Sequence, residues 1–165
     1  MVRERFVLQC PFCRIAEHEE PAAFVYEDGE LMAFMDKNPI SLGHTLVVPK
    51  AHYETVLDLP PDLAGRLFSL AVRVARAVWA AFKPDGLNLL QNNMPAAGQS
   101  VPHIHIHVIP RYYGDGITMS WPARHKPLSE LSAEAVYKIL EKIAPKVRCP
   151  FIADLARSGI GRGRR

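Results

Sequence analysis

The longest regular pattern in the chain lies between residues 62 and 82, where apolar side chains recur every three or four positions. These positions are Leu63, Leu67, Leu70, Ala71, Val74, Val78 and Phe82. Arginines fall between them, so the segment predicts an amphipathic helix with one buried face. Pro61 and Asp62 suit its start, and the PDG stretch at 84–86 ends it.

Shorter apolar runs on both sides of this helix predict strands. They cover residues 23–26, 31–35, 44–50, 86–92 and 102–110, and the first two form a hairpin around the turn 27–29. A Cys-bearing turn at 10–17 leads into a short helix, and a second helix is predicted at about 132–143. The order of strands, helix, strands, helix favours an α+β fold with an antiparallel sheet of about five strands over alternating βα units.

Length and composition fit one domain with a hydrophobic core. The chain has 165 residues, of which 48% are apolar and 22% charged, so wholesale disorder is excluded. We expect residues 1–145 to form the domain and residues 146–165 to be a C-terminal extension with an Arg-rich tail.

The net charge of +3 suggests a nucleic-acid partner only until its distribution is considered. Residues 157–165 (RSGIGRGRR) carry four arginines and no acid. Without them, 16 basic side chains face 17 acidic ones, a net charge of −1. Nucleic-acid binding is therefore not expected apart from the tail.

The chain lacks an apolar run of the roughly 18 residues that a membrane span needs. Its N-terminal segment does not resemble a signal peptide, and three cysteines do not suggest a disulfide framework. We expect a cytoplasmic protein without membrane partners.

The segment HIHIHVI at 103–109 carries the most chemical information. If it is a strand, His103, His105 and His107 project from one face, about 6.6 Å apart per two-residue step. The alternating isoleucines would then face the core. Three imidazoles so arranged are compatible with metal binding, with nucleophilic attack on phosphorus, or with a purely structural role.

HIHIHVI resembles the signature of the histidine triad (HIT) family, His-φ-His-φ-His-φ-φ with φ apolar. The segments YEDGELMAFMD, LGHTLVVPKAH, GLNLLQNN and AAGQSVP are similar to the same family in order and spacing. The resemblance covers about residues 10–115 and is nearest to the bacterial and archaeal branch with an N-terminal CxxC. Related members are nucleoside phosphoramidases and dinucleoside polyphosphate hydrolases or phosphorylases.

The resemblance implies a catalytic set. His105 would be the nucleophile that attacks the α-phosphorus of a nucleotide derivative, giving a nucleotidyl-histidine that water hydrolyses to a nucleoside monophosphate. His107 would contact the phosphate oxygens or the leaving group. Gln99 and Ser100 would surround the phosphate as charge develops.

The resemblance also implies nucleotide contacts. They are Asp36 at the ribose, His44 near the reacting atoms, Asn92 at the phosphate, and the stretch Gly98, Gln99, Ser100 and Val101, with His107. From the residues alone, Asp36 could instead cap a loop, and Asn92 and His44 could serve turns. Phe34 and apolar residues near Ile15 and Leu31 are candidates for a base pocket or for ordinary core.

Cys10 and Cys13 form CPFC, which alone fits zinc, redox chemistry or two free thiols. In the HIT branch with CxxC, ligands at the positions of His52 and His103 complete a zinc site. The resemblance therefore implies a structural Zn²⁺ held by Cys10, Cys13, His52 and His103, with no organic cofactor.

Family members form symmetric homodimers, so we expect a C2 dimer, to which Trp121 is a candidate contributor. Two alternatives stay open. One keeps the fold but makes the protein a phosphorylase or nucleotidyltransferase. The other is a zinc-dependent nucleic-acid-binding module without catalysis.

Overall fold

The computed structural model describes residues 10–119 and Ile139. In chain order the elements are α2 (Pro11–Ala16), β1 (Phe24–Glu27), β2 (Leu31–Met35), β3 (Thr45–Pro49), α3 (Pro61–Phe82), β4 (Gly86–Leu90), a 3₁₀ turn (Pro95–Ala97) and β5 (Ile106–Arg111). The helix predicted at 132–143, apart from Ile139, and the domain limit at residue 145 lie outside the described residues. No helix within the described part combines the length and apolar character needed to span a bilayer.

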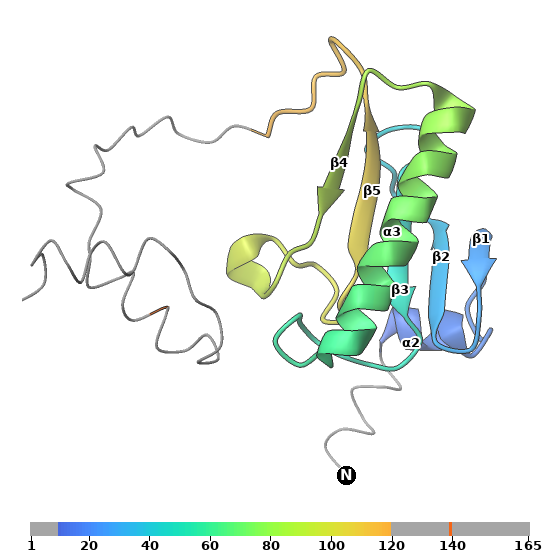
Figure 1. Cartoon of the computed structure of the whole chain (residues 1–165), viewed down its shortest axis with the longest axis vertical. Helices are drawn as coiled ribbons and strands as arrows, with labels where there is room; N and C mark the ends of the chain where they lie inside the picture. The colour runs from blue at the N-terminus through green and yellow to red at the C-terminus, as the bar shows by residue number, and fades with distance from the viewer. Residues whose placement is uncertain (1–9, 120–138, 140–165) are drawn as a thin grey trace, which may run out of the picture. The chain divides into compact units, whose positions relative to one another are not determined.

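The strands form one antiparallel sheet of five strands in the order β1-β2-β3-β5-β4. Long helix α3 lies across one face of this sheet (Figure 1). The predicted α+β class, the antiparallel sheet and the long helix are therefore confirmed.

The face of the sheet toward α3 holds one hydrophobic core. Six of the seven predicted apolar helix positions are buried there, and Phe82 is partly buried. Ala33, Val47 and Val108 meet them from the strands. The helix ends at Phe82, before the PDG stretch that predicted this end. Lys83 follows in a left-handed conformation, and its N–H still donates to the Trp79 carbonyl.

A second core lies on the opposite face of the sheet, under the N-terminal segment. Phe12 and Ile15 of α2 pack with Phe34, Leu46 and other residues of β2 and β3. Strands β2 and β3 are thus buried on both faces of the sheet, which explains why they appear in the sequence as continuous apolar runs.

The predicted strand at 102–110 starts later than expected. β5 begins at Ile106, so His103 and His105 precede the strand. The rings of His105 and His107 still lie side by side, with centroids 4.7 Å apart. Continuing the β3–β5 register would place Ile104 opposite Pro49, which has no N–H to extend the ladder. Ile104 instead donates its N–H to the Tyr53 carbonyl, 2.7 Å away. The prediction that Ile104 and Ile106 face the core is correct, and Val108 lies in the same core.

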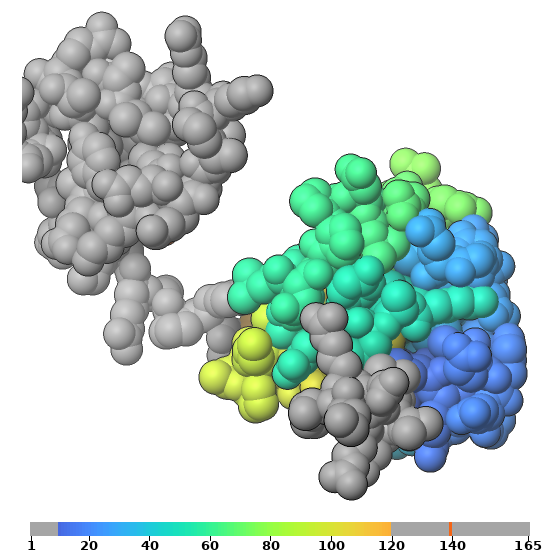
Figure 2. Space-filling model, turned by 90° about the horizontal axis from the view of Figure 1, so that it is seen from below, coloured from blue at the N-terminus to red at the C-terminus, as the bar shows by residue number. Residues whose placement is uncertain are grey.

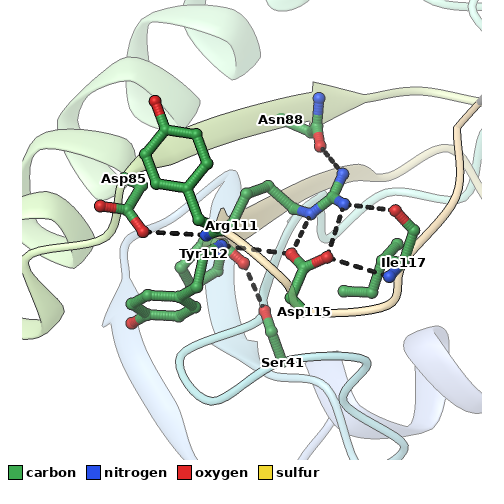
Figure 3. Close-up of polar contacts among 9 residues, drawn as sticks. Ser41, Asp85, Asn88, Arg111, Tyr112, Asp115 and Ile117 are labelled. Carbon is green, nitrogen blue, oxygen red and sulfur yellow. Dashed lines mark hydrogen bonds and ion pairs between the residues drawn. The ribbon is translucent and has the colours of Figure 1, made fainter.

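A polar clamp ends β5 (Figure 3). The Arg111 guanidinium donates to both carboxylate oxygens of Asp115, at 2.7 and 3.0 Å, and to Asn88 Oδ1 on β4 at 2.7 Å. Ser41 donates its hydroxyl to the Pro110 carbonyl at 2.7 Å. Through Ser41, the loop between β2 and β3 is fixed against β5.

Candidate functional site: a pocket beside a cysteine–histidine cluster

A cavity of about 620 Å³ opens on the face of the sheet opposite α3, next to α2. The predicted nucleotide-site residues that line it are Asp36, His44, Asn92, Gly98, Ser100, Val101, His105 and His107. Phe34 and Ile15 add apolar wall, whereas Leu31 lies in the core on the α3 side. The tertiary structure therefore gathers nearly all of the predicted set in one place.

His105 is held by a bond from one ring nitrogen. Its Nδ1 lies 2.6 Å from the His103 carbonyl oxygen, which can only accept, so Nδ1 carries the proton. Nε2 then carries the lone pair on a residue that lines the pocket. Burial lowers the pKa of His105, and the Phe12 ring packs on it edge to face at 5.2 Å. A neutral imidazole with an available nitrogen is what nucleophilic attack requires.

His107 lies beside His105, with the ring centroids 4.7 Å apart, and contacts a further histidine. Its Nδ1 is 2.9 Å from Nε2 of His44, so these atoms share one proton. Asp36 Oδ2 lies 3.5 Å from the other ring nitrogen of His44. Burial lowers the pKa of His107 to about 4, and the nearby His105 and His44 reinforce the decrease. Burial also lowers the pKa of His44, against the opposing effect of Asp36.

The loop at 92–100 forms another wall. Gly98 has a φ of 87°, and its carbonyl accepts a bond from the Asn92 amide at 3.4 Å. Ser100 and Gly98 line the pocket, but the Gln99 side chain turns away from it. Gln99 Oε1 accepts from the Met94 N–H at 2.6 Å, and its Nε2 donates to the Glu54 carbonyl at 2.7 Å. Here Gln99 braces the loop, and its expected contact with phosphate stays a prediction.

Segment 50–60 lies between this loop and the first residues that the structure describes, coloured blue, in the view of Figure 2. The Val56 N–H donates to Asn93 Oδ1 at 2.8 Å on one side. On the other side, His52 Nδ1 lies 3.3 Å from Cys13 Sγ. The segment therefore connects the pocket wall to the cysteines.

Cys10, Cys13, His52 and His103 converge, with one donor atom from each within 4.8 Å of all the others. His103 Nδ1 lies 3.3 Å from Cys10 Sγ and 3.6 Å from Cys13 Sγ. Tetrahedral zinc with sulfur and nitrogen ligands requires roughly 3.5 Å between such atoms. The spacing and the donor chemistry both fit zinc.

The outer contacts of this cluster also suit a metal. His103 Nε2 lies 2.9 Å from the Pro49 carbonyl and must donate to it, so Nδ1 presents its lone pair to the cysteines. Burial lowers the pKa of His103 to about 4, which keeps the ring neutral. Burial, together with Cys10, raises the pKa of Cys13 to about 12. A cation would be needed to make that thiol a thiolate.

Sequence reasoning missed the groups that orient the predicted residues. The carbonyls of His103, Pro49 and Glu54 and the ring of Phe12 leave no signal in the sequence. The direct contact between His44 and His107 was also not foreseen. The long-range pairing of strands β3 and β5 brings it about, since Leu46, two residues after His44, pairs with His107.

The family model of the HIT domain matches residues 17–114, more than half of the chain. The chain belongs to the HIT family. The HIT protein called "Protein hit" from Bacillus subtilis is 47% identical over 113 residues, which are 68% of this chain and 78% of that protein. Adenylylsulfatase HINT3 of Arabidopsis thaliana is 40% identical over 76% of this chain and 64% of its own length. Adenosine 5'-monophosphoramidase HNT1 of Saccharomyces cerevisiae is 36% identical over 74% of this chain and 75% of its own.

Solved HIT structures agree with this assignment. A HIT family protein from Bacillus anthracis superposes with a TM-score of 0.72 and 38% identity, covering 84% of this chain and 97% of that one. A zinc-bound histidine triad family protein from Mycobacterium smegmatis has a TM-score of 0.64 and 35% identity, covering 82% and 98%. The fold and the resemblance stated from the sequence are thus confirmed.

Proposed function

We propose that the protein is a nucleotide hydrolase that attacks the α-phosphate of a nucleotide derivative through a covalent nucleotidyl-histidine. The observation that carries this proposal is His105, whose Nδ1 is bonded to a carbonyl while the ring lines a large pocket. Relatives named adenylylsulfatase and adenosine 5'-monophosphoramidase support a substrate in which AMP is joined to sulfate or to an amine.

In the first step, His105 Nε2 forms a bond to the α-phosphorus as the bond to the leaving group breaks. The leaving group departs with the bonding electrons. It takes up a proton from the side of the pocket where His107 lies. In the second step, water attacks the phosphorus as the N–P bond breaks, and the proton that water loses restores the one given to the leaving group in the first step. A nucleoside monophosphate is released and His105 is restored.

The remaining pocket residues suit the rest of a nucleotide. Ser100, Asn92 and the backbone N–H groups of residues 100 and 101 would bind the phosphate oxygens. The N–H groups of Gly98 and Gln99 already donate to the Pro95 and Met94 carbonyls. The Asp36 carboxylate, which already accepts the Asn38 N–H at 2.9 Å, would accept from the ribose hydroxyls. Phe34 and Ile15 would contact the base through apolar surface.

The cysteine–histidine cluster would hold a structural Zn²⁺. Four protein ligands would close its coordination, so the ion would take no part in the reaction. Its contribution would be to connect three parts of the chain: the start of α2, the segment that carries His52, and His103. Since the carbonyl of His103 also holds His105, zinc would stabilise the position of the nucleophile.

A homodimer is also proposed. Among the described strands, β4 is an edge of the sheet, and Leu89 on it is exposed. Phe68 and Trp79 on α3 are exposed and eleven residues apart, about three helical turns, so they share one face. Sedimentation of wild type and Trp79→Glu tests whether two chains associate through β4 and this face of α3. The extension at 146–165 and a cytoplasmic location stay predictions.

A turnover panel tests the activity. Adenosine phosphoramidate, adenylyl sulfate, adenylyl-lysine and diadenosine polyphosphates are offered with and without phosphate, to wild type and to His105→Ala. Hydrolysis by wild type alone, with AMP as product, is expected. A nucleoside diphosphate that forms only with added phosphate would indicate a phosphorylase. Turnover of none of these substrates, or equal rates for both proteins, would overturn the proposal.

A further inference from the structure

The contact between His44 and His107 needs one proton, and the side on which it lies decides what His107 can do. His44 Nε2 and His107 Nδ1 are 2.9 Å apart. If the proton belongs to His44, then His107 Nδ1 accepts and its Nε2 carries a proton. If the proton belongs to His107, its Nε2 holds a lone pair instead.

A backbone amide decides which of the two rings carries the shared proton. The Ile40 N–H donates to His44 Nδ1 across 3.4 Å. An amide N–H cannot accept, so His44 Nδ1 must present its lone pair, and the proton of a neutral His44 lies on Nε2. His44 Nε2 therefore donates and His107 Nδ1 accepts.

Protonation of His44 does not reverse this direction. A charged His44 would carry a proton on both ring nitrogens, and Asp36 Oδ2, 3.5 Å from Nδ1, would balance the charge. Its Nε2 would still donate to His107. Both protonation states of His44 give His107 the same tautomer.

The surroundings of His44 prevent the ring from changing partners. The side chain is 3% exposed. The backbone N–H of His44 donates to the Ser41 carbonyl at 3.1 Å, and the backbone carbonyl of His44 accepts from the Asp36 N–H at 3.0 Å. Before it, Gly43 adopts a φ of 93° in a place where a Cβ would lie 2.8 Å from the Phe82 ring. These contacts fix the main chain that carries the buried ring.

We infer that His44 is a positioning residue that keeps His107 as a hydrogen-bond donor at Nε2, opposite in polarity to the neighbouring His105. At His105, a carbonyl takes the Nδ1 proton and leaves a lone pair at Nε2. At His107, His44 supplies the Nδ1 bond and leaves a proton at Nε2. Two similar rings 4.7 Å apart therefore offer one nucleophile and one donor. This inference rests on the proposed function, because it assigns the donor to the leaving group.

The chemical consequence depends on the leaving group. An amine expelled from phosphorus gains an electron pair and needs a donor, whereas 4-nitrophenolate is stable without one. If His107 no longer carries its proton at Nε2, the reaction that expels an amine should therefore slow far more than the reaction that expels 4-nitrophenolate. A general loss of packing would slow both equally.

The kinetic test compares His44→Leu and His44→Gln with wild type on adenosine phosphoramidate and on the 4-nitrophenyl ester of AMP. For His44→Leu, kcat/KM with the phosphoramidate should fall about 10²-fold or more, and kcat/KM with the ester by less than about tenfold, because kcat/KM reports the step that expels the leaving group. His44→Gln, whose amide can donate, should restore part of the difference. The exposed His18→Gln serves as the matched control and should resemble wild type. Equal losses on both substrates would overturn the inference.

A second measurement is independent of activity and does not need a variant at position 44 to fold. Long-range ¹⁵N–¹H spectra of wild-type protein with labelled histidine report the tautomer of each ring, and His107→Asn assigns the signal. The expected result is protonation of His107 at Nε2 and of His105 at Nδ1. Protonation of His107 at Nδ1 would overturn the inference. A wild type that turns over neither substrate would instead refute the proposed function.

Discussion

His103 and His105 are two residues apart in one motif, yet their side chains belong to different sites. His103 lies wholly buried among two thiols and His52, and its Nε2 is bonded to a carbonyl. His105 lines the pocket among nitrogen and oxygen groups, and its Nδ1 is bonded to a carbonyl. In each ring, the nitrogen that a carbonyl fixes determines which nitrogen is left for chemistry. The neighbours of that nitrogen decide between metal binding and reaction.

The largest expected effect separates the two sites at the pocket. His105→Asn should lower kcat/KM by at least about 10³-fold, because no other described group replaces the nucleophile. Zinc content and melting temperature should stay at wild-type values, since the thiols and His103 are unchanged. Metal analysis and a thermal melt check this. Loss of the metal along with the activity would show that the two sites are one functional unit.

The converse change acts on the cysteine cluster. Cys10→Ser should leave well under one zinc per chain and lower the melting temperature by at least about 5 °C, since metal binding contributes to folding. The third cysteine of the sequence, Cys149, is not in the proposed ligand set, so Cys149→Ser is the matched control and should keep one zinc per chain. Stoichiometric zinc in Cys10→Ser would contradict the ligand set, and activity in the purified variant would measure how far zinc supports His105.

A smaller effect is expected from the turn that carries His44. In Gly43→Ala, the new methyl would meet the Phe82 ring at 2.8 Å on a backbone with a φ of 93°. The free energy of unfolding should fall by about 1–3 kcal/mol. In Gly29→Ala nothing lies within 4 Å of the added methyl, so the change should stay within about 0.5 kcal/mol. Urea unfolding of both variants measures the difference, and equal values would refute the packing argument.

The smallest predicted effect concerns pH. Burial lowers the pKa of His105, so its neutral form persists below the ordinary value of about 6.5. kcat/KM should therefore decrease only at a pH below that value. Stability should also be lost as pH falls from about 6.5 through the lowered pKa of His107, about 4, because the unfolded chain binds that proton more readily. Circular dichroism at each pH separates the two effects. A decrease of kcat/KM with a midpoint at or above pH 6.5 would contradict the burial of His105.

The elements could be predicted because each depends on local pattern. The spacing of Leu63, Leu67 and Leu70 specified α3 and its buried face, and the turn after Glu27 specified the hairpin. Among the predicted site residues, CPFC and HIHIH pointed, through the resemblance, to side chains that the structure brings into one cluster and one pocket. The start of β5 was predicted wrongly, because it depends on Pro49, a residue opposite it in the sheet and distant in the chain.

By itself, the sequence determined the residue types of both sites, the order of the elements and the family. Through the family resemblance it also implied how the histidines divide between the sites. Only the tertiary structure decided which ring nitrogen of each histidine is left for chemistry. The deciding contacts are carbonyls and an amide of the main chain: Pro49 for His103, His103 for His105, and Ile40 for His44. Every residue carries such groups, so they leave no mark in a sequence. They acquire a role only when folding brings a particular ring within hydrogen-bonding distance.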